Sequence, residues 1–438
     1  MIRLLKGLAL DVTAIRESRD FRLMSIGQVA SSLGSQAAMV ALPFQIYVIS
    51  HSAALVGLLG AFELGPMIVV SLVGGALADR RDRRPVLAAA QVGVIVLAAL
   101  LFILSLADHK PPVIAILGLG GILAGCTALT NVATMAIVPG ILGTENLRSG
   151  LAFNYGVAQA SGIVGPGVGG LLIAALGGVS WIYALDAVSC IGMLAAALAI
   201  GPQPPLGVEH HPPVLESIKE GLKFVASTKA LAGSFVIDIN AMMFGMPRAL
   251  FAVLSLTVYH AGASGTGLLY SAIAVGGTLS VLGSGWVQNV NRLGRVTIGM
   301  VLIWGISIGA AGLVRSIALA AILLAIAGMA DGLSAVCRAT ISQTLTPARL
   351  RGRMSSVFSL VVTSGPRLGD MESGLVAGLV GALNSVLIGG IGCVVGVGVT
   401  VLAFPQLAAY EADTAIELMR SEDAAHLAEV SAGNLPAG

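Results

Sequence analysis

Long apolar segments follow one another along the chain, separated by short polar connections. A membrane-spanning helix needs about 18 or more apolar residues, and twelve segments reach that length. They lie at about residues 23–49, 54–77, 86–107, 112–138, 148–176, 179–200, 232–258, 264–287, 296–314, 317–344, 353–381 and 384–404. The sequence lacks the alternating segments of about ten residues that form a transmembrane β-barrel. The pattern therefore predicts an all-α membrane protein with twelve transmembrane helices.

The composition supports a lipid-facing surface. Charged residues make up 11% of the chain and hydrophobic residues 56%, whereas a soluble domain carries about 25% charged residues. So little charge cannot cover a water-facing surface, and we expect the lipid bilayer to surround the protein. The net charge of +2 gives no indication of a nucleic-acid partner.

Lysine and arginine are distributed unequally between the two sides of the predicted bundle. With both termini in the cytoplasm, nineteen lie in cytoplasmic segments and only Lys110 and Arg315 on the opposite side. Positive residues gather on the cytoplasmic side of membrane proteins. We therefore expect a multi-pass protein of the cell (inner) membrane with both termini in the cytoplasm.

The longest polar connection divides the chain into two halves of six helices. We expect a cytoplasmic N-terminal segment, an amino bundle, a cytoplasmic linker, a carboxy bundle and a cytoplasmic tail. Their expected bounds are 1–22, 23–200, 201–231, 232–404 and 405–438. The halves share sequence, because "ATMAIVPGILGTENLRSG" follows the fourth apolar segment and "ATISQTLTPARLRGR" follows the tenth.

Two motifs resemble signatures of the major facilitator superfamily, which is built from two such six-helix repeats. "GALADRRDRR" matches the loop signature Gly-x-x-x-Asp-Arg-x-Gly-Arg-Arg at Gly75, Asp79, Arg80, Arg83 and Arg84, with Asp82 in place of the second glycine. The resemblance implies a conformational gate in which Asp79 caps the eleventh helix near Gly352, and carboxylates do stabilise helix N-termini.

The second motif is "GPGVGG", which resembles the core of the family's antiporter signature in helix five. Gly165, Pro166, Gly169 and Gly170 match, although the upstream glycines of the full pattern are absent. The resemblance implies export rather than import. Along most of its length the chain also resembles the branch of this family that exports enterobactin, a siderophore.

In this family the first, fourth, seventh and tenth helices line the substrate cavity. The first segment carries a polar stripe at helical spacing that includes Gln28, Ser32, Ser35 and Gln36, and the fourth carries Thr127, Thr130, Asn131 and Thr134. Such stripes fit a cavity lining, although hydrogen bonds between neighbouring helices explain them as well. We predict that these residues line the cavity.

The carboxy half carries full charges within its predicted helices, where ionised groups usually mark a transport pathway. These are Asp238, Arg248, Asp331, Arg338, Arg367, Asp370 and Glu372. Counting ~1.5 Å per residue along each helix predicts three pairs at equal depth. They are Asp238 with Arg338, Asp331 with Arg367, and Arg248 with Asp370. Arg338 also falls on the same helix face as Asp331.

Four acids and three arginines leave one carboxylate in this half without a cation. A desolvated carboxylate without a partner can exchange a proton, and we predict that Glu372 has this role. Glu63, buried in the second helix, is the rival, and Asp186 is a weaker third candidate. A static structural network would explain the same residues.

The sequence therefore predicts a proton-coupled exporter of a small amphipathic or lipophilic molecule, with a siderophore as the expected substrate. A multidrug efflux antiporter is the alternative, and a non-transporting membrane receptor or partner subunit is the alternative of another class. We find no ATP-binding motif and no soluble catalytic domain, so we expect no enzyme. We also expect no cofactor, no metal and a monomeric protein.

Overall fold

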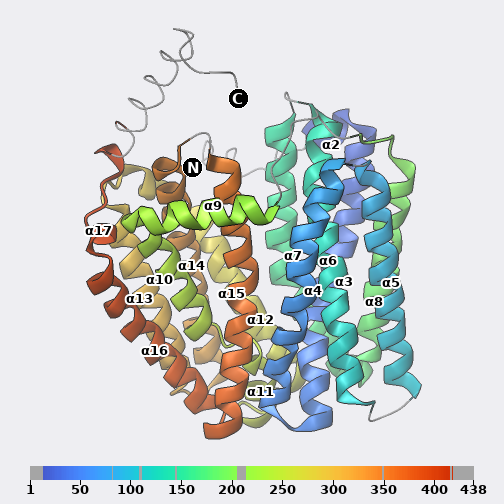
Figure 1. Ribbon diagram of the computed structural model, residues 1–438. Helices are drawn as coiled ribbons and strands as arrows, with labels where there is room; N and C mark the ends of the chain where they lie inside the picture. Colours follow the sequence, from blue (N-terminus) through green and yellow to red (C-terminus); the bar gives the residue numbers. More distant parts are fainter. Residues whose placement is uncertain are drawn as a thin grey trace, which may run out of the picture.

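A computed structural model describes residues 13–80, 82–107, 111–143, 146–204, 214–347, 350–414 and 417. Within these ranges the chain is helical, with short connections and no strand. Two helical bundles lie side by side, as Figure 1 shows. The fold is therefore the all-α architecture that the apolar segments predict.

The amino bundle begins with the short helix α2 (Thr13–Glu17) and continues with long helices. These are α3 (Arg19–Ser50), α4 (Ala53–Arg80), α5 (Arg83–Ala107), α6 (Val113–Leu142), α7 (Leu147–Leu176) and α8 (Ser180–Ala199). Helix α9 (Val214–Ser227) then connects the two bundles. Its Val225 packs in a small apolar cluster with Val357 of the carboxy bundle, and its Glu220 pairs with Arg353.

The carboxy bundle differs from the amino bundle because its first helix is broken. It contains α10 (Lys229–Phe244), α11 (Leu250–Thr257), α12 (Gly262–Gly283), η1 (Ser284–Asn289), α13 (Leu293–Ala311), α14 (Ile317–Leu345), α15 (Arg351–Val380), α16 (Ala382–Ala403) and α17 (Pro405–Ala408). The break between α10 and α11 contains Pro247, which has no N–H for a helical hydrogen bond.

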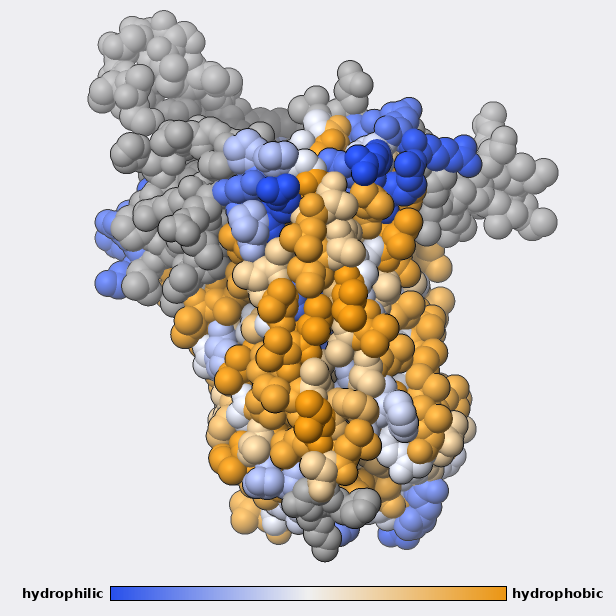
Figure 2. Space-filling model, turned by 90° about the vertical axis from the view of Figure 1, so that its right-hand side faces the viewer, coloured by the Kyte–Doolittle hydropathy of each residue, from blue (hydrophilic) through white to orange (hydrophobic). Residues whose placement is uncertain are grey.

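Ten of the described helices are long and apolar enough to cross a membrane. The other two predicted spans correspond to α15, which carries five charged residues, and to the broken pair α10 and α11. Hydrophobic residues cover most of the middle of the face seen in Figure 2. Large exposed side chains such as Leu379 (87% exposed) and Leu402 (84%) belong to the apolar exterior, as expected of a surface that faces lipid.

The two bundles meet along two helix pairs. Helix α4 packs against α15, and α7 packs against α12. We call the end of the molecule nearest α9 the linker end and the opposite end, where α11 lies, the far end (Figure 1). The two pairs together form the seam between the bundles.

Candidate functional site

Glycines allow the bundles to approach closely along the seam near the far end. A Cβ atom added to Gly57 of α4 would lie 2.7 Å from both the carbonyl oxygen of Asp370 and the Cα of Gly374, on α15. One added to Gly60 would lie 2.5 Å from the carbonyl oxygen of Arg367. Small residues permit this backbone contact between membrane helices. The seam is therefore closed at the far end.

The helix-five motif contributes to the same closure. A Cβ added to Gly170 of α7 would meet the carbonyl of Ala263, and Ser271 of α12 donates to the carbonyl of Ile163 at 2.6 Å. Gly165 and Gly169 instead face Gln36 and Ala37 of α3, the helix that packs against α7 inside the amino bundle. The motif thus packs one face inside the amino bundle and the other across the seam.

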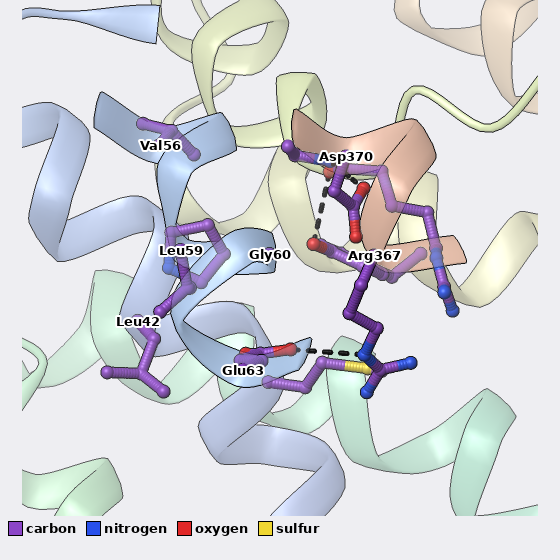
Figure 3. Close-up of a pocket in the computed structure, with 12 residues that line it drawn as sticks. Leu42, Val56, Leu59, Gly60, Glu63, Arg367 and Asp370 are labelled. Atoms are coloured by element: carbon purple, nitrogen blue, oxygen red, sulfur yellow. Dashed lines mark hydrogen bonds and ion pairs between the residues drawn. The ribbon is translucent and has the colours of Figure 1, made fainter. Parts of the chain in front are cut away.

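An ion pair crosses the seam beside these glycines. The Arg367 Nε of α15 donates to the Glu63 Oε2 of α4 at 3.2 Å. Both side chains are largely buried, at 25% and 18% exposed. Figure 3 shows the two side chains pointing toward each other, with Asp370 nearby. This pair joins an amino-bundle carboxylate to a carboxy-bundle cation at membrane depth.

Asp370 is held by the break in the first helix of the carboxy bundle. Its Oδ1 accepts a hydrogen bond from the backbone N–H of Ala249 at 2.9 Å. Ala249 precedes the first residue of α11, where a backbone N–H has no acceptor within the helix. Arg248, the residue before Ala249, lines the same cavity as Asp370. The proline break therefore presents both a cation and a free N–H to Asp370.

These groups line an internal cavity of about 90 Å³. Its polar lining residues are Glu63, Arg248, Tyr270, Arg367 and Asp370. The Tyr270 hydroxyl donates to the Arg248 carbonyl at 3.1 Å. The volume suffices for several water molecules. Two carboxylates and two guanidinium groups thus share one small, seam-spanning space, which we call the seam cluster.

A second charge cluster lies within the carboxy bundle. The Arg338 Nη2 of α14 lies 2.9 Å from the Asp238 Oδ1 of α10 and 3.6 Å from the Asp331 Oδ1 of its own helix. The Asp238 and Arg338 side chains are buried, whereas that of Asp331 is 31% exposed. Arg338 also donates to Ser334 at 3.0 Å. One arginine is therefore shared by two acids.

The structure tests the three pairs predicted from depth. The pair of Asp238 with Arg338 is formed, and so is the same-face contact of Arg338 with Asp331. The predicted pair of Asp331 with Arg367 is wrong, because Arg367 lies on α15, which packs against α4 and not against α14. Arg248 and Asp370 line one cavity, but no ion pair within 4.0 Å joins them among the described residues.

The position of Arg367 also changes the charge count. The count assumed that the acids and arginines of the carboxy half pair only with one another. Arg367 instead forms an ion pair with Glu63 of the amino half. Glu372 is half-buried on α15, and in the described ranges no hydrogen bond or ion pair includes it. Glu63 and Glu372 are thus distinguished by geometry: one bridges the seam and the other stands alone.

The polar stripe of α3 turns partly into the amino bundle rather than toward a cavity. Ser35 donates to the Asp186 Oδ1 of α8 at 3.0 Å, although we expected Ser35 to line the cavity. The Gln36 side chain lies against Gly162 of α7. Gln28 and Ser32 bond to each other at 3.1 Å. The spacing showed that these residues share a face but not which neighbour that face meets.

The polar stripe of α6 is divided in the same way. Thr130 and Thr134 are buried, and Thr130 accepts a hydrogen bond from Gln91 of α5 at 3.4 Å. Their predicted place on a cavity wall therefore stays a prediction. Asn131 is exposed and Thr127 is half-buried, with its hydroxyl bonded to the Leu123 carbonyl at 3.0 Å. These two keep a position from which they could contact a ligand.

The predicted gate motif is only partly described. Gly75, Asp79 and Arg80 belong to a stretch of α4 whose side-chain surroundings are not described, so the capping role of Asp79 stays a prediction. Arg83 donates to the Ala136 carbonyl at 2.9 Å and Arg84 to the Ile200 carbonyl at 3.2 Å. Both arginines therefore bind backbone carbonyls of neighbouring helices at the linker end.

Sequence reasoning treated Asp82 only as a departure from the family signature. Its Oδ1 accepts from the backbone N–H of Arg84 at 3.0 Å and from that of Gln203 at 3.1 Å. Asp82 directly precedes α5, and an aspartate there is a common helix cap. That preference is the signal from which the contact could have been found.

Comparison with known proteins gives consistent results. The family model described as Major Facilitator Superfamily matches residues 24–369. The chain is 28% identical over 388 residues to a protein of Citrobacter koseri named enterobactin exporter EntS, covering 88% of this chain and 92% of that protein. A protein of the same name from Shigella boydii serotype 4 is 28% identical over 395 residues, covering 90% and 93%. These names describe transporters, not enzymes.

Solved structures agree on the fold. A mutant of the nucleoside transporter NupG superposes with a TM-score of 0.72 at 14% identity, covering 88% of this chain and 100% of that one. A bacterial homologue of the iron transporter ferroportin, in an inward-facing state, gives a TM-score of 0.66 at 17% identity, covering 89% and 98%. At these identities the likeness concerns the fold alone.

Proposed function

Because the chain belongs to the Major Facilitator Superfamily, we propose that it is a proton-coupled exporter of a small amphipathic molecule. The single observation that carries the proposal is the Glu63–Arg367 ion pair across the seam. The relatives named enterobactin exporter support a siderophore as the transported molecule, and the helix-five motif supports export as the direction. Protons and this substrate are then the partners of the protein in the bilayer.

The orientation follows from the distribution of positive residues. The linker end holds Arg83 and Arg84, and the chain segments at this end carry most of the lysines and arginines. Positive residues favour the cytoplasmic side. The linker end is then cytoplasmic, the far end faces outward, and the closed seam corresponds to an inward-facing state.

The seam cluster supplies a coupling mechanism. When the bundles separate at the far end, Arg367 leaves Glu63 but stays beside Asp370, three residues further along α15. Residues three apart on a helix are neighbours. Glu63 is then a carboxylate at membrane depth without a cation, which is costly. It becomes neutral by binding a proton from outside, as isolated buried carboxylates do.

The return step runs in the opposite direction. Closing the far end brings Arg367 back against Glu63, and the guanidinium stabilises the ionised carboxylate. The proton is released while the far end is shut and the path to the cytoplasm is open. One proton therefore enters for each cycle in which the substrate leaves, and a change of partner at Arg367 links the two movements.

The test uses purified protein in liposomes with an imposed pH gradient and enterobactin as the transported probe. Wild-type protein should accumulate enterobactin against its concentration gradient. Glu63→Gln should reduce this accumulation at least tenfold and leave enterobactin binding intact, because the amide cannot exchange the proton.

Glu372→Gln is the matched comparison, since Glu372 is the half-buried acid that the charge count selected. It should retain accumulation. Loss of accumulation in Glu372→Gln with retention in Glu63→Gln would place coupling on α15 instead. A wild-type protein that does not respond to the pH gradient would refute proton coupling.

A further inference from the structure

A large cavity at the far end is not part of the seam cluster. Its volume is about 640 Å³, within the range of small-molecule sites. It is formed by the ends of α3, α5, α7 and α8 together with Gly262 and Ala263, which lead into α12. We call this space the outer cavity. It therefore contains elements of both bundles.

The cavity has a polar base. The Gln45 Nε2 donates to the Ser105 hydroxyl at 2.7 Å, and the Gln45 Oε1 accepts from the Tyr183 hydroxyl at 2.6 Å. Gln45 is only 5% exposed. A primary amide carries two N–H groups and a hydroxyl carries one O–H, so one amide hydrogen and the Ser105 hydroxyl hydrogen remain for a ligand. The base thus offers donors to an acceptor group.

The walls are apolar and partly aromatic. They include Phe44, Val48, Leu106, Ile173 and Trp181. Trp181 is 52% exposed and its ring lies 5.9 Å from that of Phe102. A few polar groups within an apolar lining are typical of sites that bind amphipathic ligands. The lining suits an apolar or aromatic body that carries a hydrogen-bond acceptor.

Helix α3 connects this cavity with the seam cluster. Met39, Leu42 and Pro43 line the small internal cavity, whereas Phe44, Gln45 and Val48 line the outer one. The seam reaches the outer cavity as well, because the backbone of Gly170 packs against Ala263. Separation of the bundles at the far end therefore opens the wall between the transport path and the outer cavity.

From these observations we infer that the outer cavity is a second binding site for the exported molecule, occupied from outside before release. This inference rests on the proposed function. It assigns to the site an amphipathic ligand with a hydrogen-bond acceptor, held by Gln45 and Ser105 and covered by Trp181. An acyl chain of a bilayer lipid is the competing occupant.

Trp181 supplies the readout, with enterobactin added to the outside of proteoliposomes as the probe. Enterobactin should change the tryptophan fluorescence, and the change should disappear in Trp181→Phe. Ser105→Ala should raise the enterobactin concentration needed for half of the fluorescence change about fivefold, which corresponds to the loss of one net hydrogen bond. Val48→Phe should weaken the effect by placing a ring in the cavity without adding a second tryptophan there, and it should slow export.

Val96→Phe is the matched control. Val96 is 49% exposed on α5 and does not line the cavity, whereas Val48 is 46% exposed and does. Equal behaviour of the two variants would overturn the inference. So would quenching of Trp181 by phosphatidylcholine with brominated acyl chains that enterobactin cannot relieve, because a lipid would then occupy the site.

The outcomes separate this inference from the proposed function. Fluorescence binding at Trp181 without transport driven by the pH gradient would refute the proposed function and leave the outer cavity as a binding site. Gradient-driven export with no Trp181 response would support the exporter and refute the second site.

Discussion

The glycine contact at the seam predicts how one methyl group shifts the conformation of the protein. In Gly57→Ala the added Cβ would lie 2.7 Å from the Asp370 carbonyl oxygen and from the Gly374 Cα. Carbon atoms prefer a separation of about 3.5–4.0 Å. All the near atoms belong to backbone, so no side chain can rotate away. The helices α4 and α15 must therefore move apart.

The energetic penalty falls on only one state. Overpacking of this kind costs about 1–3 kcal/mol, and it arises only while the far end is closed. A state in which the bundles have separated at that end carries no such clash. A difference of that size changes a conformational equilibrium by roughly 5–150-fold. Gly57→Ala should therefore populate the state that is open at the far end.

Gly118→Ala is the control because it makes the same substitution inside another long helix of the amino bundle, α6. Outside its own helix and chain neighbours, a Cβ at Gly118 has no atom of the described residues within 4 Å. The gain in helix propensity on changing glycine to alanine, about 1 kcal/mol, is common to both variants. Their difference then reports the seam contact alone.

The assay is a distance measurement between spin labels by double electron–electron resonance. Ile103 of α5 and Leu379 of α15 are exposed near the far end of opposite bundles (58% and 87%). Each of these two residues is replaced by a cysteine that carries a spin label. The four native cysteines are replaced by alanine. Gly57→Ala should increase the population at longer distance and Gly118→Ala should not. Identical distributions in the two variants would refute the reasoning.

Three further predictions follow from the other contacts. Asp238→Asn should lower the free energy of unfolding by about 3 kcal/mol, the range for breaking a buried pair, and Arg338→Gln in addition should recover part of the loss, as measured by thermal unfolding in detergent. Asp82→Ala should cost about 1 kcal/mol by removing a helix cap and the bond to Gln203, which the same melting experiment checks. Asp186→Asn should retain transport and its pH dependence, because Asp186 bonds to Ser35 and Cys190 inside the amino bundle and these partners do not change when the bundles separate; loss of pH dependence in proteoliposomes would contradict this.

The number and order of the helices could be predicted from sequence because the composition of each apolar segment alone indicates that it spans the membrane. The burial of a helix in lipid depends on its own composition, and ten helices meet that condition. The break at Pro247 could also be expected from local chemistry. The charged α15 is recognisable as a span only together with its neighbours, because α4 supplies the carboxylate that its Arg367 needs.

The pairing of charges could be predicted only in part. Depth along a helix gives the height of a residue but not the direction in which its side chain points. Asp238 and Arg338 met because their helices are close within one bundle. Arg367 matched Asp331 in height, yet α15 faces α4 across the seam. Periodicity failed for Ser35 for the same reason, since its partner Asp186 lies on α8.

The contacts at the linker end explain why movement is expected at the seam rather than within the bundles. In the amino bundle the segment after α8 donates from Gln203 N–H to Asp82 at 3.1 Å, just before α5. In the carboxy bundle the segment after α16 donates from Asp413 N–H to the Asn291 side chain at 2.9 Å, just before α13. Asp82 and Asn291 occupy matching places in the two repeats.

Each repeat thus ties the end of its sixth helix to the start of its third. Backbone contacts strengthen both ties, from Arg83 N–H to the Gln203 carbonyl at 3.1 Å and from Ala412 N–H to the Asn291 carbonyl at 2.8 Å. A bundle closed on itself in this way moves as one body. The exchange of partners proposed for Arg367 requires such a motion, because Glu63 and Arg367 separate only if the bundles rotate without deforming.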